Sequence, residues 1–120
     1  MPKVSVYGLG HCTTCQKAIA FLEQQGVTIV TFHDVKAKRL TRAQIAKLAK
    51  LAGGPEALFS KRALKYRALG LHERTLTPEE MLDLMTAEYT FITRPVVVPE
   101  GGSAATAGFA PKRIKALLGL

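Results

Sequence analysis

The sequence predicts an α/β fold with a mixed sheet, built in the order β-α-β, inserted helical block, β-β-α. Three observations predict it. A strand-like segment at 3–7, a helix-like segment at 13–25 and a β-branched segment at 27–32 follow one another closely. Two capping boxes within 41–88 indicate helices there. A valine run at 96–98 then leads through a glycine turn to a last helix-like segment.

The composition favours one ordinary globular domain over residues 1–120. The chain is 48% hydrophobic and 22% charged, and it is long enough to bury a core. It has no apolar run of membrane-spanning length (about 18 residues), so we expect no membrane span. We also expect no secretory signal, and two cysteines without one favour a reducing cytoplasm.

The first strand and the first helix meet at Cys12 and Cys15, the only two cysteines of the chain. The first turn of a helix presents unpaired N–H groups and the positive end of the helix dipole. A thiolate at Cys12 is stabilised there, so we expect its pKa to fall and the sulfur to be nucleophilic. Cys15 lies about one turn further on, where its thiol can attack an adduct on Cys12 and close a disulfide.

Two other interpretations of the cysteine pair remain open. A C-x-x-C is often half of a zinc site, but zinc needs four protein ligands, or three and water. The other candidates here are His11, His33 and His72, with no second cysteine pair. Two structural buried cysteines are the other alternative. A redox pair is favoured, and neither a metal nor another cofactor is expected.

The segment at 27–32 predicts a second strand, parallel to the first because a helix connects them. His33 is expected to follow this strand as a loop or core-edge residue. In the helical block, about 41–88, Thr41 and Thr77 open the capping boxes. Short helical segments are expected at 56–59 and 62–69.

Basic residues crowd the block from Lys36 to Arg67, where Glu56 is the only acid. The whole chain has 17 Lys and Arg against 9 Asp and Glu, a net charge of +8. This favours an anionic partner: a small oxyanion, a nucleic acid or an acidic protein face. The alternative is a solvated basic helix surface.

The valine run at 96–98 predicts a buried strand with Pro95 at its start, because proline cannot donate to a ladder. Residues 100–103 form a turn signal, and 104–108 are the candidate return strand. Pro111 opens the last helix, with its apolar residues expected to point inward: Ile114, Leu117 and Leu118.

A C-x-x-C at the first strand–helix junction, in this order of elements, indicates a thioredoxin-like sheet. In that arrangement a proline before the later strand faces the active-site cysteines. Pro95 holds this position, so we predict that the Arg94–Pro95 bond is cis. The alternative is an ordinary trans proline at a strand edge.

The chain resembles the glutaredoxin-like arsenate reductases and their Spx-type regulator relatives over nearly its whole length. Three motifs carry the resemblance: Tyr7-Gly8 leading to Cys12-Thr13-Thr14-Cys15-Gln16-Lys17-Ala18, Tyr66-Arg67-Ala68-Leu69-Gly70-Leu71, and Arg94-Pro95-Val96-Val97-Val98.

The resemblance implies an arsenate reductase in which Cys12 attacks arsenate. The glutathione-using enzymes resolve the adduct with an external thiol, whereas the C-x-x-C of this chain can resolve it internally through Cys15. Thioredoxin would then reduce the Cys12–Cys15 disulfide. The oxyanion would be held by Arg94, which matches the arginine before the cis-proline, and by a further set: Arg62, Lys61 and the local N–H groups at Thr13 and Thr14. Physically, a guanidinium suits bidentate contact with a tetrahedral oxyanion.

The sequence departs from the reductase branch at two oxyanion arginines. One aligns with Ser60, with Arg62 two residues later, and the other is replaced where the chain has Gly108-Phe109-Ala110. Both departures resemble the Spx-type side. The alternatives are therefore an Spx-type redox switch that binds RNA polymerase, and a general disulfide reductase. Direct nucleic-acid binding is not expected.

Overall fold

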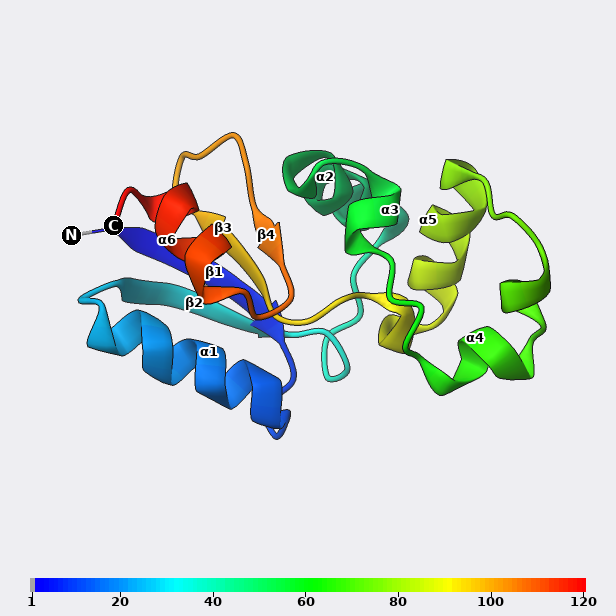
Figure 1. The fold of residues 1–120 in the computed structure, drawn as a ribbon, viewed down its shortest axis with the longest axis horizontal. Helices are drawn as coiled ribbons and strands as arrows, with labels where there is room; N and C mark the ends of the chain where they lie inside the picture. The colour runs from blue at the N-terminus through cyan, green and yellow to red at the C-terminus, as the bar shows by residue number, and fades with distance from the viewer. Residues whose placement is uncertain (1) are drawn as a thin grey trace.

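The computed structural model describes residues 2–120, which contain a four-stranded sheet in the order β2-β1-β3-β4 (Figure 1). β1 lies at the centre, parallel to β2 and antiparallel to β3, and β4 is antiparallel to β3. The sheet is therefore mixed, as predicted. The strand bounds are β1 Lys3–Gly8, β2 Thr28–Asp34, β3 Val96–Pro99 and β4 Thr106–Ala107.

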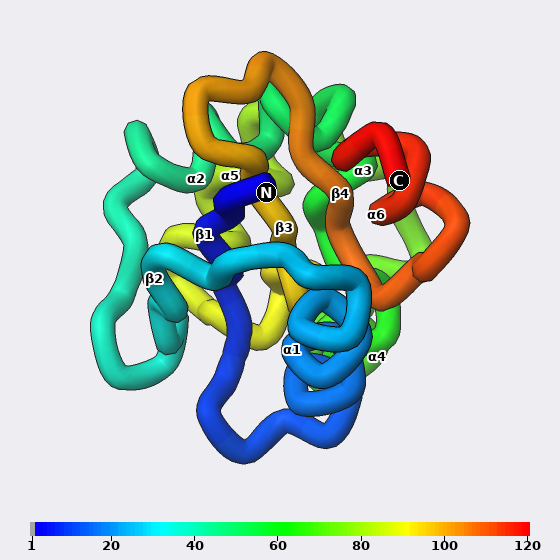
Figure 2. Tube along the Cα trace, turned by 90° about the vertical axis from the view of Figure 1, so that its left-hand side faces the viewer, coloured from blue at the N-terminus to red at the C-terminus, as the bar shows by residue number. Residues whose placement is uncertain are grey.

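Helices α1 and α6 pack on one face of the sheet. The interior of this layer is a cluster of buried side chains from β1, α1, β3 and α6 together with Val27. The end-on view in Figure 2 shows α1 running beside the strands. The bounds are α1 Thr13–Gln24 and α6 Pro111–Leu118. Ile114 is fully buried, whereas Leu117 and Leu118, both expected to point inward, are partly buried.

The helical block lies between β2 and β3 in the chain, and its buried side chains form the larger core together with Val96 of β3 and Ala107 of β4. Both predicted capping boxes are present, at Thr41 and at Thr77. The Arg42 guanidinium joins the first and last long helices of the block through Glu79 at 2.5 Å and Asp83 at 2.8 Å. The elements are α2 Arg42–Ala52, α3 Pro55–Leu58, α4 Leu64–Ala68, η1 Leu71–Glu73, α5 Pro78–Ala87 and η2 Tyr89–Phe91.

Two strands, β2 and β4, differ from the sequence prediction by two residues at one end. β2 continues through Asp34, so His33 lies within the strand rather than after it. His33 pairs with Tyr7 of β1, and their ring centroids are 5.2 Å apart. Pairing with a central strand thus extends β2 beyond its β-branched run. β4 has only two residues and is followed by Gly108, whose φ of +85° is left-handed.

No helix within residues 2–120 has the length and apolar character needed to cross a membrane.

Candidate active site

Cys12 is the residue at which α1 begins. Its backbone is extended, its N–H donates to the Leu9 carbonyl at 3.3 Å, and its carbonyl accepts from the Gln16 N–H at 2.9 Å. The cysteine side chain therefore sits over the unpaired N–H groups of the first turn. Cys12 is partly exposed, whereas Cys15, inside that turn, has no exposed surface. Both cysteines are free thiols in this structure.

The environment of Cys12 lowers its pKa. Partial burial raises the pKa of the Cys12 thiol, but four favourable interactions outweigh this: the Cys15 N–H, the Cys15 thiol, the Thr14 N–H and the positive charge of Arg94. Each of them stabilises the thiolate over the thiol. Cys12 is therefore the more acidic and more accessible sulfur of the pair.

Cys15 is shifted in the opposite direction. Burial raises its pKa, and the neighbouring Cys12 adds to the rise through its hydrogen bond and its charge. The opposing effects of the Leu9 backbone and of Arg94 are smaller than this sum, and the pKa of Cys15 reaches about 11. The two thiols of one helical turn are thus chemically distinct.

Two residues that sequence reasoning missed hold the cysteine turn in place. A Cβ added at Gly8 would lie 2.7 Å from the Cys15 sulfur, so only glycine allows this close approach. The Asp34 carboxylate accepts from the Gly10 N–H at 3.1 Å, and from Lys36 and Ala37 N–H at 2.9 Å each. The sequence carries a signal for Asp34, because the parallel strands β1 and β2 end at the same edge of the sheet and this places the end of β2 beside the cysteine turn.

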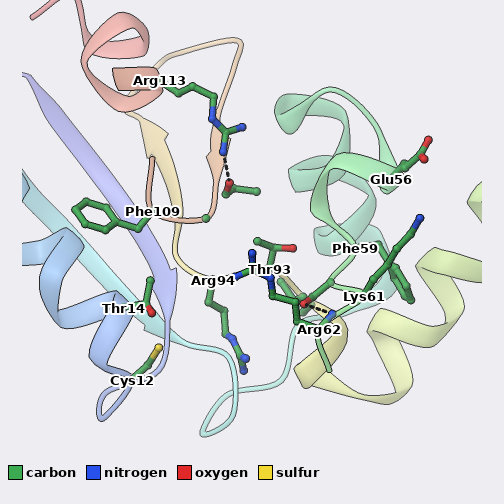
Figure 3. Close-up of a pocket in the computed structure, with 14 residues that line it drawn as sticks. Cys12, Thr14, Glu56, Phe59, Lys61, Arg62, Thr93, Arg94, Phe109 and Arg113 are labelled. Atoms are coloured by element: carbon green, nitrogen blue, oxygen red, sulfur yellow. Dashed lines mark hydrogen bonds between the residues drawn. The ribbon is translucent and has the colours of Figure 1, made fainter. Parts of the chain in front are cut away.

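A cavity of about 740 Å³ lies beside Cys12, between the sheet layer and the helical block (Figure 3). It brings together most of the predicted oxyanion residues: Thr14, Lys61, Arg62 and Arg94 line it with Cys12. Thr13 is exposed and does not line it, since successive residues of a helix point about 100° apart. Glu56 is the one acidic residue in the lining.

Arg94 extends from the start of β3 into the space between Cys12 and Arg62 in Figure 3. The Arg94–Pro95 peptide bond is cis, as predicted from the sequence. The Arg94 guanidinium carbon also lies 6.0 Å from the centre of the Tyr89 ring, within the range of a cation–π contact. Arg94 is thus oriented by an aromatic ring on one side and faces the cavity on the other.

A short ladder joins the two segments that carry the cavity's cations. The Ser60 N–H donates to the Phe91 carbonyl at 2.7 Å, and the Thr93 N–H donates to the Leu58 carbonyl at 2.8 Å. Phe59 and Ile92 form the antiparallel bridge between these bonds. Lys61 and Arg62 directly follow one strand of this ladder, and Arg94 directly follows the other. The ladder therefore positions all three cations relative to one another.

Arg113, in the first helical turns of α6, is a fourth cation of the cavity that sequence reasoning missed. Its Nη2 donates to the Ala107 carbonyl at 3.2 Å. The resemblance predicts an arginine at 108–110, where no arginine occurs. Arg113 enters the cavity instead because α6 packs across β3 and β4. No group of three or more metal-ligating His, Cys, Asp or Glu side chains occurs within residues 2–120.

Fold and site together define a thioredoxin-like protein with a C-x-x-C beside a cationic cavity. More particularly, the chain belongs to the ArsC family, whose model matches residues 7–117.

Its relatives include both regulators and reductases. It is 30% identical over 95 residues to the global transcriptional regulator Spx 1 of Lactococcus lactis, covering 78% of this chain and 73% of that protein. It is 26% identical over 106 residues to an Escherichia coli arsenate reductase, covering 86% and 73%. A solved arsenate reductase from Vibrio cholerae shares the fold, with a TM-score of 0.83 at 21% identity and coverage of 98% of each chain.

Proposed function

We propose that this protein is an arsenate reductase. Cys12 would be the nucleophile, and a Cys12–Cys15 disulfide would be reduced by thioredoxin. The observation that carries the proposal is a thiol of lowered pKa at a cavity lined by four cations: Lys61, Arg62, Arg94 and Arg113. Such a cavity favours an oxyanion, and such a sulfur attacks an electrophilic centre.

In the first step the Cys12 thiolate attacks arsenic. The guanidinium of Arg94 holds the oxyanion next to the sulfur, and Lys61 and Arg62 neutralise its remaining charge. The N–H groups of Thr14 and Cys15, which interact with the Cys12 sulfur, add the field of the helix start. A sulfur–arsenic bond forms, and one arsenate oxygen leaves as water after taking up protons from solvent.

In the second step Cys15 resolves the adduct. Adduct formation removes the Cys12 charge, one of the causes that raise the pKa of Cys15, so the buried thiol becomes more acidic when its thiolate is needed. The Cys15 sulfur then attacks the Cys12 sulfur. The sulfur–arsenic bond breaks, its electron pair stays on arsenic, and arsenite leaves as As(III). Thioredoxin returns two electrons to the disulfide, in a reducing compartment such as the cytoplasm.

The test is NADPH consumption with arsenate, thioredoxin and thioredoxin reductase, run beside Cys12→Ser and Cys15→Ser. We expect arsenate-dependent turnover that is abolished in Cys12→Ser and strongly reduced in Cys15→Ser. Turnover that persists in Cys12→Ser would contradict the assigned nucleophile. Turnover with disulfide substrates but not with arsenate would favour a general disulfide reductase.

The second candidate is an Spx-type redox-switch regulator that binds RNA polymerase. It is favoured by the 30% identity to the regulator Spx 1. In that case the Cys12–Cys15 disulfide would form in response to oxidants rather than during turnover. Co-purification of RNA polymerase with the wild-type chain, lost or gained in Cys12→Ser, together with no arsenate-dependent turnover, would decide for the regulator.

A further inference from the structure

The two most exposed large apolar side chains within residues 2–120 lie at the two ends of helix α4. The large apolar residues exposed within this range are Leu64, Leu69, Val30 on β2 and Leu120. Leu64 begins α4 and is 91% exposed, and Leu69, the C-cap residue directly after α4, is 58% exposed. α4 has no buried residue. A helix that presents leucines to solvent at both ends is a candidate binding surface.

The fold holds α4 from one side only. Tyr66 is partly buried, with its ring edge-on to Phe59 at 6.1 Å between centroids. Lys65 is anchored by an ion pair with Glu88 at 2.5 Å. Leu64 and Arg67, three residues apart, share the opposite side of the helix. The orientation of α4 is thus fixed by Tyr66 and Lys65, while Leu64 on its outer side is left exposed to solvent.

Basic side chains predominate around these leucines, although Glu88 pairs with Lys65 and Glu73 lies beside Gly70. We define the α4 patch as Lys61, Arg62, Leu64, Arg67 and Leu69. Its three cations form no ion pair within residues 2–120, and no acidic residue occurs between Ala57 and His72. The patch therefore suits a partner that is acidic and has an apolar area of its own.

The patch adjoins the proposed site. Lys61 and Arg62 line the cavity beside Cys12 and lead directly into α4. In Figure 1 α4 and the amino-terminal end of α1 both lie along the lower edge of the molecule. A protein seated on the α4 patch could therefore reach Cys12, whereas it could not reach the fully buried Cys15.

We propose that the α4 patch is the docking surface for the acidic thiol–disulfide protein that reduces the Cys12–Cys15 disulfide. This rests on the proposed function. A second copy of the chain does not fit, because two identical basic patches repel each other. A small anion leaves the leucines without a partner. An acidic protein with an apolar rim around its own cysteine satisfies both parts of the patch.

Cys12 is the accessible sulfur of the pair, so the incoming thiolate attacks there. The partner's thiolate attacks the Cys12 sulfur and forms a mixed disulfide, and Cys15 leaves as a thiolate that takes up a proton. The partner's second thiol then attacks the partner's own sulfur in the mixed disulfide. Cys12 is released as a thiolate, the partner leaves as a disulfide, and two electrons have passed to this chain.

The experiment measures reduction of the pre-oxidised protein, without arsenate, by thioredoxin with NADPH and thioredoxin reductase. Leu64→Ser/Arg67→Glu changes only patch residues that do not line the cavity. We expect its kcat/KM for thioredoxin to fall about tenfold, with reduction by dithiothreitol unchanged. The wild-type rate constant should also fall with added salt more steeply than that of the variant.

The matched control is Val30→Ser/Lys50→Glu. It removes an exposed aliphatic side chain and reverses one charge, but on β2 and in the last turn of α2. Wild-type kinetics in the control and a loss in the patch variant support the docking surface. Equal kcat/KM values for thioredoxin in all three proteins would overturn the proposal. A patch variant that keeps the wild-type kcat/KM and loses only binding to duplex DNA would overturn it as well. If thioredoxin fails to reduce even the wild-type disulfide, the recycling step of the proposed function fails as well.

Discussion

The contact between Gly8 and Cys15 makes a sharp prediction for Gly8→Ala. The added Cβ would lie 2.7 Å from the Cys15 sulfur and 3.4 Å from its Cβ. Ordinary contacts of this kind are about 3.5–4.0 Å, so the sulfur must move by about 1 Å. Cys15 is fully buried and has little room to do so. We expect the free energy of unfolding to fall by about 1–3 kcal/mol, the usual cost of overpacking.

The displacement should also affect the second step of the proposed reaction. A misplacement of about 1 Å costs on the order of 100-fold in rate when two groups must meet in one geometry. The assays are thermal or denaturant unfolding, and the rate of Cys12–Cys15 disulfide formation after a single turnover with arsenate. Gly10→Ala is the control, because its Cβ would meet only the Asp34 carboxylate at an ordinary 3.5 Å.

A double-mutant cycle isolates the contact. In a Cys15→Ala background the sulfur is gone, so Gly8→Ala should cost much less stability than in the wild type. An equal cost in both backgrounds would refute the argument, because the loss would then come from somewhere other than the Cys15 sulfur.

Three further predictions concern Cys12, Asp34 and Thr41. Alkylation of Cys12 by iodoacetamide should have a midpoint pH below that of an ordinary thiol. Arg94→Ala should raise this midpoint, since the Arg94 charge lowers the pKa of Cys12. An unchanged midpoint in Arg94→Ala would count against a site shared by Arg94 and Cys12. Hydrogen bonds from the Ala37, Gly10 and Lys36 N–H groups lower the pKa of Asp34 in the fold, so its contribution to stability is present above the unfolded-state pKa and is lost as the pH falls through the folded-state value. Asp34→Asn should flatten this acid limb in chemical denaturation, and a limb identical to wild type would show that other carboxylates produce it. Thr41→Ala should lower the free energy of unfolding by about 1 kcal/mol through loss of the cap on α2, and a change near zero would show that the Gln44 half of the box suffices.

Local signals explain why the order of elements was predictable. The capping boxes at Thr41 and Thr77 and the glycine stops depend only on a few neighbouring residues, and the structure contains both boxes. The C-x-x-C at a strand–helix junction likewise predicts the direction of the Cys12 pKa shift, although Arg94 contributes to it from a distant part of the chain. The end of β2 could not be predicted from local signals, because His33 joins the strand through its pairing with Tyr7 of β1.

The composition of the cavity was only partly predictable for the same reason. Thr13 and Thr14 are equivalent in the sequence, and the rotation of α1 decides that only Thr14 lines the cavity. Whether Arg113 lines the cavity depends on where α6 packs against the sheet, and no sequence spacing specifies that position. Gly8 had a signal, a glycine at the end of the strand before the cysteines, but its partner atom is visible only in the packed structure.

The ladder between residues 58–60 and 91–93 has a consequence for how such a protein can diversify. Cys12 and Cys15 lie at the start of α1, whereas Lys61 and Arg62 belong to the helical block. In the proposed reaction, exchanging the side chains at 60–62 would alter which anion is bound without changing either cysteine. Under that proposal one cysteine pair can be combined with different sets of cations, so that the bound anion changes while the sulfur chemistry stays the same.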